Sequence, residues 1–208
     1  MILIIQNGFI QTLIQKYLDE EIEVIKAYEY MGELNQLDLS KYSLVIVLGG
    51  HQSLTSVDSN SDTEKVIDFI RFCYQKEKPL IGICLGCQMI GRAMGCDIKR
   101  MSYGRIDYTT HLVIDEYTYD SIFRCHNDYI IPNDNIEVIC SFQEMPYLIR
   151  SGSLLGIQCH PDIPPEYLTS CTSLCYYRYT SQYSDEEINT KNKILMTKLI
   201  EMARNFRN

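Results

Sequence analysis

The sequence predicts an α/β fold with a mostly parallel central sheet, whose second half is antiparallel or mixed. Two observations carry this prediction. In the first half of the chain, short apolar runs alternate with segments of helical spacing, which is typical of βαβ units and a parallel sheet. In the second half, strand-like runs follow one another with only short turns between them, which is typical of antiparallel pairing.

The first half contains four apolar runs with the length of buried strands. They span residues 1–6, 22–28, 43–48 and 79–83. Helical spacing covers 9–19, and also 62–76, where Val66, Ile67 and Ile70 belong to one apolar stripe. A short helix is expected over 87–94, and Gly95 ends it.

The second half is expected to contain strands and one long helix. The strand-like segments lie near 96–101, 106–115, 136–142, 147–150 and 154–159. The stretch 163–184, rich in Pro, Thr, Ser, Tyr and Cys, is expected to be an irregular insertion, and 185–206 to be an amphipathic C-terminal helix. Because there is no repeat and no low-complexity linker, residues 1–208 are predicted to form a single domain.

The composition argues against several classes of partner. A net charge of −8 disfavours nucleic acid and anionic membranes as partners. No apolar window approaches the length of a membrane span, and the run 1–6 breaks at Gln6, Asn7 and Gly8, which is typical of a buried first strand and not of a signal sequence. Nine cysteines, an odd number, without an export signal predict reduced thiols and a cytoplasmic location.

Cys84 lies between two glycines at the junction of a predicted strand and a predicted helix. The carboxyl ends of parallel strands are where α/β proteins bind ligands. Gly82-Ile83-Cys84-Leu85-Gly86 has the spacing of the Gly-x-Ser-x-Gly turn of hydrolases, with cysteine in place of serine. A side chain at Gly82 or Gly86 would crowd such a turn. The positive end of the following helix would favour a thiolate at Cys84 and leave the N–H of Leu85 free to hold an oxyanion.

Two other interpretations of Cys84 remain open at this point. A free cysteine is often simply a small buried hydrophobic residue. Cys84 and Cys87 also have the Cys-x-x-Cys spacing of a redox pair, which likewise sits at the start of a helix. Substitution separates these interpretations, because hydrolysis would depend on Cys84, whereas a redox pair would need both thiols.

The sequence predicts no metal site. Cys125-His126 and Cys159-His160 are adjacent pairs whose side chains point apart, and no Cys-x-x-Cys pair that could partner them lies elsewhere. A phosphate-binding loop is not predicted either, because the glycines lack the required spacing and lysine.

Three separated segments resemble the class I, or triad, glutamine amidotransferases. Residues 82–88 fit the family's Gly-x-Cys-x-Gly-x-Gln, residues 48–53 look like its Gly-Gly-x-x-Ser oxyanion strand, and residues 156–162 are similar to its Gly-x-Gln-x-His-Pro-Glu. The segments occur in the family's order. The resemblance extends over roughly residues 1–162, and the expected C-terminal helix is also compatible with it. It implies a three-layer, flavodoxin-like sandwich similar to the stand-alone glutaminase domain of GMP synthases.

The resemblance implies a role for each matching residue. Cys84 would attack the side-chain amide of L-glutamine, and His160, oriented by Asp162, would keep the thiol ionised and protonate the departing ammonia. The N–H groups of Gly50 and Leu85 would hold the oxyanion. A γ-glutamyl thioester on Cys84 would then be hydrolysed to glutamate. The implied substrate-binding residues are Gly49, Gln88, His126 and Asn127.

The chain departs from the family pattern at two of these places. Asp162 stands where the family has glutamate, so its carboxylate is one methylene shorter. Asn127 replaces the glycine of the family's His-Gly-Asp, within a segment, residues 124–129, that the resemblance makes a substrate-binding loop.

The family-like region uses the whole sequence, so we expect an ammonia acceptor to be bound by a synthetase partner chain. Three activities stay open: an amidotransferase subunit, a free-standing glutaminase, or a hydrolase of another γ-glutamyl compound. A non-catalytic regulatory module with the same fold is a fourth alternative. The resemblance implies no cofactor.

Overall fold

A computed structural model describes residues 1–8, 13–55, 61–109, 112–170 and 183–206. Seven strands form the main sheet in the order β2-β1-β3-β4-β11-β10-β9. Their bounds are β1 Ile2–Gln6, β2 Ile22–Lys26, β3 Leu44–Val47, β4 Leu80–Ile83, β9 Glu137–Phe142, β10 Met145–Ser151 and β11 Leu154–Ile157. Neighbours from β2 to β11 are parallel, whereas β10 is antiparallel to both β11 and β9. The five parallel strands have the flavodoxin-like order, so the predicted fold class is confirmed.

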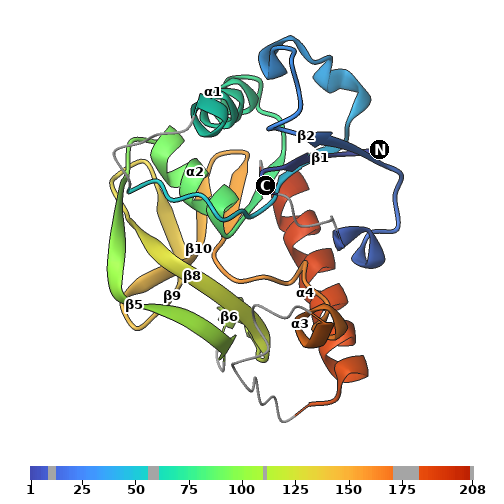
Figure 1. Cartoon of the computed structure of the whole chain (residues 1–208), viewed down its shortest axis with the longest axis vertical. Coiled ribbons are helices and arrows are strands. Elements are labelled where there is room, and N and C mark those ends of the chain that lie inside the picture. The colour runs from blue at the N-terminus through green and yellow to red at the C-terminus, as the bar shows by residue number, and fades with distance from the viewer. Residues whose placement is uncertain (9–12, 56–60, 110–111, 171–182, 207–208) are drawn as a thin grey trace.

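Consecutive residues of the central strands alternate between two buried cores. Leu3 and Val45 belong to the core that contains helices α1 (Ser61–Gln75) and α2 (Leu85–Ala93). Ile4 and Ile46 belong to the core that contains helix α4 (Asp185–Arg204). Figure 1 shows α1 and α2 on one side of the sheet and α4 on the other. Burial on both faces explains why these strands are continuous apolar runs in the sequence.

Helix α4 begins at a capping box. The Ser184 hydroxyl accepts a hydrogen bond from the N–H of Glu187, and the Glu187 side chain accepts one from the N–H of Ser184. Such caps satisfy backbone donors that the first turn leaves without partners. Leu195, Met196 and Leu199 are then fully buried against the sheet. Burial of side chains of this size stabilises a fold by about 1.5–3 kcal/mol each.

Two antiparallel pairs lie outside the main sheet. Strand β5 (Asp97–Thr109) pairs with β8 (Ile122–Ile131), and β6 (Leu112–Ile114) pairs with β7 (Tyr117–Tyr119). The β5–β8 pair packs against α2 (Figure 1). The sequence had led us to expect a loop over residues 124–129, and this was wrong because the segment belongs to β8. The sequence did not indicate a strand because the polar residues Arg124, His126 and Asp128, which are buried here, are more typical of a loop.

The segments around the first strand and before α4 differ in part from expectation. The helix expected over 9–19 is limited to the 3-10 turn η1 (Ile14–Tyr17) among the described residues, because Leu18 is already extended. The other 3-10 turns are η2 (Leu34–Gln36) and η3 (Leu39–Lys41). The expected irregular stretch 163–184 begins with helix α3 (Pro165–Ser170), and its residues 171–182 lie outside the described part of the chain.

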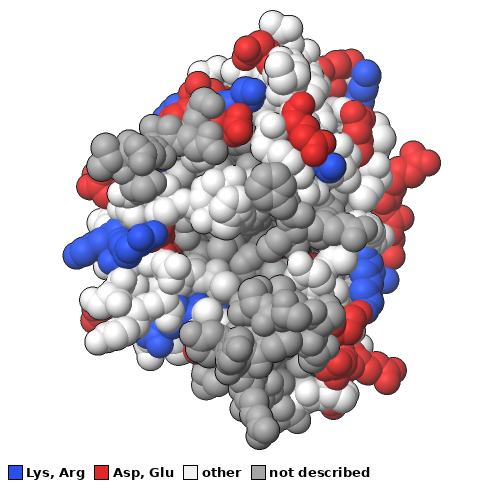
Figure 2. Space-filling view, in the orientation of Figure 1, with Lys and Arg blue, Asp and Glu red and all other residues white. Residues whose placement is uncertain are grey.

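In the parts of the chain that the structure describes, no helix has the length and apolar character needed to cross a membrane. Figure 2 shows basic and acidic side chains interspersed around the margin of one face, with no continuous Lys and Arg surface among the described residues of that view. This distribution follows the dispersed charge of the sequence.

Candidate active site

Three neighbouring parallel strands end at the edge of the sheet where the candidate residues lie. Strand β4 lies between β3 and β11, with Gly82 in register with Val47 and Ile83 in register with Ile157. Cys84 directly follows β4, and Gly49 and His160 follow the two neighbouring strands within three residues. The carboxyl ends of parallel strands share one edge, so residues distant in the sequence meet there.

The backbone at Cys84 has the strained geometry of a nucleophile turn. Its φ of 52° and ψ of −105° lie outside the regions that residues with side chains favour, and α2 starts at the next residue. A Cβ atom on Gly82 would collide with the carbonyl group of Gly86, and one on Gly86 would collide with the carbonyl group of Val47. The expected need for both glycines therefore has a direct steric cause.

His160 lies in contact with both predicted partners. Its Nδ1 is 3.1 Å from Oδ1 of Asp162, so the shorter carboxylate reaches the ring directly. Burial alone would lower the pKa of His160, but its electrostatic and hydrogen-bond interactions with Cys84 and Asp162 outweigh burial and raise that pKa well above its ordinary value. This environment favours the protonated, charged form of the His160 ring.

Gly49 packs directly against these two side chains. A Cβ atom at Gly49 would lie 3.1 Å from Cε1 of His160 and 3.4 Å from Cβ of Cys84. Any larger residue at this position would push on both reactive groups. Gly49 therefore approaches Cys84 and His160 this closely only because it lacks a side chain.

Main-chain carbonyl groups of β8 accept hydrogen bonds from three residues of the site. The carbonyl oxygen of Phe123 accepts from the N–H of His160 at 2.8 Å. That of Cys125 accepts a hydrogen bond from Sγ of Cys84 at 3.6 Å. That of Asp128 accepts from the side-chain amide of Gln88 at 2.9 Å.

The two predicted oxyanion residues are neighbours. Leu85 is the first residue of α2, and an N–H in the first turn of a helix has no acceptor within the helix. A Cβ atom at Gly50 would lie 3.1 Å from Cδ2 of Leu85. The segment 48–55, named here the oxyanion loop, therefore runs alongside the start of the helix.

The start of the oxyanion loop is tied to Asn7, which follows β1. Nδ2 of Asn7 donates to the carbonyl oxygen of Leu48 at 2.7 Å, and Nε2 of Gln52 donates to the carbonyl oxygen of Asn7 at 2.6 Å. Oε1 of Gln52 is buried and has no hydrogen-bond partner within the described ranges. Sequence reasoning missed Asn7, whose only signal is a polar residue at the end of the first apolar strand.

The residues predicted to bind substrate differ in the burial and hydrogen bonding of their side chains. The amide of Gln88 is buried and bonded to Asp128 and, at 3.3 Å, to Oε1 of Gln158. Both ring nitrogens of His126 are engaged, Nδ1 with the carbonyl oxygen of Asp128 at 3.1 Å and Nε2 with the hydroxyl of Tyr147 at 3.2 Å. Burial lowers the pKa of His126 to about 4, so the ring is neutral near pH 7.

Asn127 lies on the opposite side of β8 from His126. Its side chain is exposed and covers Gly104 of β5, where an added Cβ atom would collide with Oδ1 of Asn127. The structure therefore brings Gly49 and Gln88 to the site, gives His126 a supporting position behind it, and turns Asn127 away.

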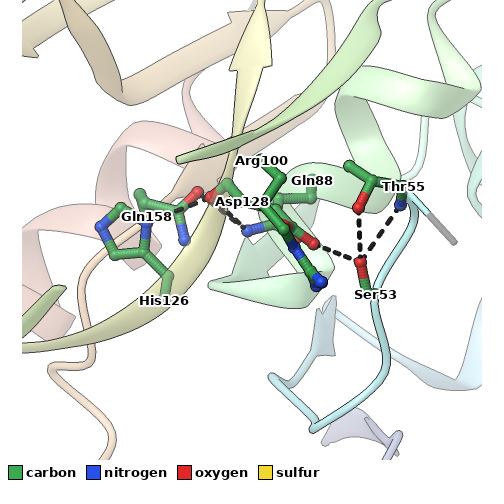
Figure 3. Close-up of polar contacts among 7 residues, drawn as sticks. All are labelled: Ser53, Thr55, Gln88, Arg100, His126, Asp128 and Gln158. Carbon is green, nitrogen blue, oxygen red and sulfur yellow. Dashed lines mark hydrogen bonds and ion pairs between the residues drawn. The ribbon is translucent and has the colours of Figure 1, made fainter. Parts of the chain in front are cut away.

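A second polar cluster adjoins the site and was not predicted. Figure 3 shows Asp128 joined to Ser53 of the oxyanion loop, with the Arg100 side chain of β5 beside it. Oδ2 of Asp128 accepts from the Ser53 hydroxyl at 2.5 Å, and its Oδ1 lies 3.0 Å from Nε of Arg100. The only sequence signal was that Ser53 and Asp128 each fall inside a family-like motif.

Cys87 is poorly suited to a redox pair with Cys84. Its side chain is fully buried, and its sulfur packs against Gly156 of β11. Burial, reinforced by the neighbouring thiol of Cys84, raises the pKa of the Cys87 thiol well above its ordinary value. A thiol that resists ionisation is a weak nucleophile in disulfide exchange. Among the described residues, no group of three or more His, Cys, Asp or Glu residues could hold a metal ion.

Comparison with known proteins identifies the family. The model of the family described as glutamine amidotransferase class-I matches residues 3–167. The chain belongs to the class I glutamine amidotransferases. This amidotransferase-family chain is 43% identical to a glutamine amidotransferase-like protein of Acanthamoeba polyphaga mimivirus over 206 residues, which cover 98% of this chain and 97% of the viral protein.

Two further likenesses place the family member among its relatives. It is 26% identical over 159 residues to one of the subunits of the glutamine-hydrolysing GMP synthase of Saccharolobus solfataricus, and the match covers 71% of this chain and 79% of that relative. It superimposes on the crystal structure of a glutamine amidotransferase from Thermotoga maritima with a TM-score of 0.72 at 15% identity, across 99% of this chain and 95% of the other. The second likeness concerns the fold alone.

Proposed function

We propose that the protein hydrolyses the side-chain amide of L-glutamine through a γ-glutamyl thioester on Cys84. One observation carries the proposal: Cys84 sits on a strained turn against His160, whose Nδ1 is 3.1 Å from Asp162. Membership of the amidotransferase family supports the substrate class. A nucleophile, a base and an orienting carboxylate in contact are the groups that acyl transfer from an amide requires.

In the first half of the reaction, the Cys84 sulfur forms a bond to the amide carbon of glutamine. The carbonyl oxygen takes up the electron pair, and the N–H groups of Gly50 and Leu85 hold the resulting oxyanion. The imidazolium of His160 then gives its proton to the amide nitrogen, the carbon–nitrogen bond breaks, and ammonia leaves. The carboxylate of Asp162 stabilises the charged ring before this transfer.

In the second half, water replaces ammonia. The neutral ring of His160 takes a proton from water, whose oxygen attacks the thioester carbon, and the carbon–sulfur bond breaks to release glutamate and the Cys84 thiolate. Gly49 and Gln88 would contact the substrate, whereas His126 would act by holding the backbone at Asp128. Asn127 would have no direct contact, because its side chain covers β5.

The ammonia is proposed to serve an acceptor that a synthetase partner chain binds. The relationship to the Saccharolobus solfataricus protein supports this division of labour, because that relative is itself named as one of the subunits of a glutamine-hydrolysing synthase. Without transfer, the same chemistry would be that of a glutaminase.

The test is covalent labelling with 6-diazo-5-oxo-norleucine, a diazoketone that mimics glutamine, followed by peptide mapping. We expect label on Cys84, protection by excess L-glutamine, and loss of label in Cys84→Ser. Cys87→Ser is the matched control, since it removes a neighbouring thiol whose burial makes it unreactive, and it should label like the wild type.

Other results would assign a different function. Label on Cys84 that other γ-glutamyl compounds block but L-glutamine does not would indicate a γ-glutamyl hydrolase. An unlabelled Cys84 would favour the non-catalytic module. Equal label on Cys84 and Cys87 would favour the interpretation of these two cysteines as a redox pair.

A further inference from the structure

The oxyanion loop is connected to the far side of the site through one buried carboxylate. Asp128 of β8 is 4% exposed, and its Oδ2 accepts from the Ser53 hydroxyl at 2.5 Å. The Ser53 hydroxyl also accepts from the N–H of Thr55 at 3.2 Å. Ser53 therefore links the turn of the loop at Thr55 to β8, three residues after Gly50.

Arg100 fixes the second oxygen of this carboxylate. Its Nε lies 3.0 Å from Oδ1 of Asp128, and the Arg100 side chain is itself largely exposed. A buried carboxylate is costly unless it is paired and hydrogen-bonded. With Ser53 on one oxygen and Arg100 on the other, Asp128 is held in a single orientation (Figure 3).

The main chain of the same residue supports the helix that follows the nucleophile. The carbonyl oxygen of Asp128 accepts from Nε2 of Gln88 at 2.9 Å, and Nδ1 of His126 is 3.1 Å from it. One residue therefore binds α2 through its backbone and the oxyanion loop through its side chain. The two sides of the oxyanion site, Leu85 on α2 and Gly50 on the loop, share this support.

We propose that Asp128 is a positioning residue that, through Ser53, fixes the oxyanion loop relative to the start of α2. This inference rests on the proposed function. The Asp128 carboxylate keeps the N–H of Gly50 at the place where the oxyanion forms, and it does not itself touch the substrate. Such a contact acts on the transition state, so its loss should lower kcat and leave KM nearly unchanged.

The test compares Ser53→Ala, Asp128→Asn and the double variant with a matched control. Ser40→Ala is that control, because the Ser40 hydroxyl donates to Asp38 at 2.6 Å on an exposed turn outside the site. We expect kcat for glutamine hydrolysis to fall about tenfold to a hundredfold in both single variants, since a small misplacement can cost that much. The double variant should fall no further than the worse single variant, because both remove one interaction. Ser53→Thr, which keeps the hydroxyl, should restore most of the rate.

A second measurement does not depend on the chemistry. Hydrogen–deuterium exchange of the peptide covering 48–55 should accelerate in Ser53→Ala and Asp128→Asn and not in Ser40→Ala. Unchanged exchange in the two site variants would overturn the inference. Accelerated exchange in a protein whose wild type shows no Cys84-dependent turnover of glutamine would sustain the inference about the loop and defeat the proposed function.

The kinetic split excludes the main alternative role. If Asp128 bound the substrate directly, Asp128→Asn would raise KM and Ser53→Ala would have little effect. That result would overturn the positioning role even with normal turnover in the wild type.

Discussion

Whether the carboxylate of Asp162 reaches His160 depends on the backbone geometry as well as on the length of the side chain. The family pattern has glutamate at this position, and a side chain one methylene shorter raises the question of reach. Asp162 nevertheless lies 3.1 Å from the ring of His160. Both residues follow β11 within five positions, so the turn that carries His160 also carries its partner inward.

His126 is the residue whose burial has the clearest consequence for stability. Its pKa falls to about 4 because burial opposes the charged ring, whereas an unfolded chain returns it to about 6.5. Between about pH 6.5 and about pH 4 the ring of His126 is therefore protonated in the unfolded state and neutral in the folded state. Because the unfolded state binds more protons, the free energy of unfolding falls as pH drops from about 6.5 to about 4. Over that window the loss from His126 is about 3 kcal/mol.

Urea unfolding near pH 7 and near pH 5 measures this effect. Between those conditions the wild type should lose about 2 kcal/mol more stability than His126→Gln, which cannot titrate. His51→Gln is the matched control, because it makes the same substitution at an exposed position. Identical pH dependence in His126→Gln and wild type would contradict a buried neutral ring.

At the scale of elements, the turn between β4 and α2 depends on two glycines. Gly82→Ala would place a methyl group against the carbonyl group of Gly86. We expect a loss of about 1–3 kcal/mol in the free energy of unfolding, as for other overpacked sites, together with slower labelling of Cys84. Gly32→Ala is the control, because the atoms nearest to its added methyl group belong to the far end of the Tyr30 side chain, which can move. This variant should stay within about 0.5 kcal/mol of wild type.

The elements that the sequence predicted and those it did not predict differ in what they bury. The strands 1–6, 43–48 and 79–83 bury apolar side chains on both faces, and their composition alone identified them. Strand β8 buries Arg124, His126 and Asp128, which pair with Asp107, Tyr147 and Ser53 from other segments. Polar residues that are satisfied only by distant partners look like loop residues when the partners are unknown.

The candidate site divides in the same way. Cys84, His160 and the glycines fall in local motifs because the chemistry and the tight turn restrict each position. The contacts of Ser53 with Asp128 and of Asn7 with Leu48 join segments 75 and 41 residues apart. Such pairs depend on how the strands are ordered in the sheet, which no local pattern contains.

At the scale of the whole molecule, the sheet couples the two cores. Neighbouring residues such as Leu3 and Ile4 pack into opposite cores, so neither core can be lost while the other keeps its strands. We therefore expect residues 1–208 to unfold as one cooperative unit.

Two tryptophan variants test this expectation, since the chain has no tryptophan of its own. Phe72→Trp reports on the core beneath α1, and Phe142→Trp reports on the core beneath α4. Urea unfolding of each variant is followed by tryptophan fluorescence and by far-ultraviolet circular dichroism. Within each variant, the two probes should give the same urea midpoint. A fluorescence midpoint that differs from the dichroism midpoint of the same variant would indicate two folding units.

The β8 carbonyl groups at Phe123, Cys125 and Asp128 suggest where this scaffold could accept new sequence. They hold His160, Cys84 and Gln88 through atoms that every amino acid supplies. Randomising the side chain of Cys125 in a mutant library should therefore leave many clones reactive, whereas inserting one residue there would shift every later carbonyl group by one place. A directed-evolution campaign for altered substrate range could draw its diversity from exchanges along this strand and keep its length fixed.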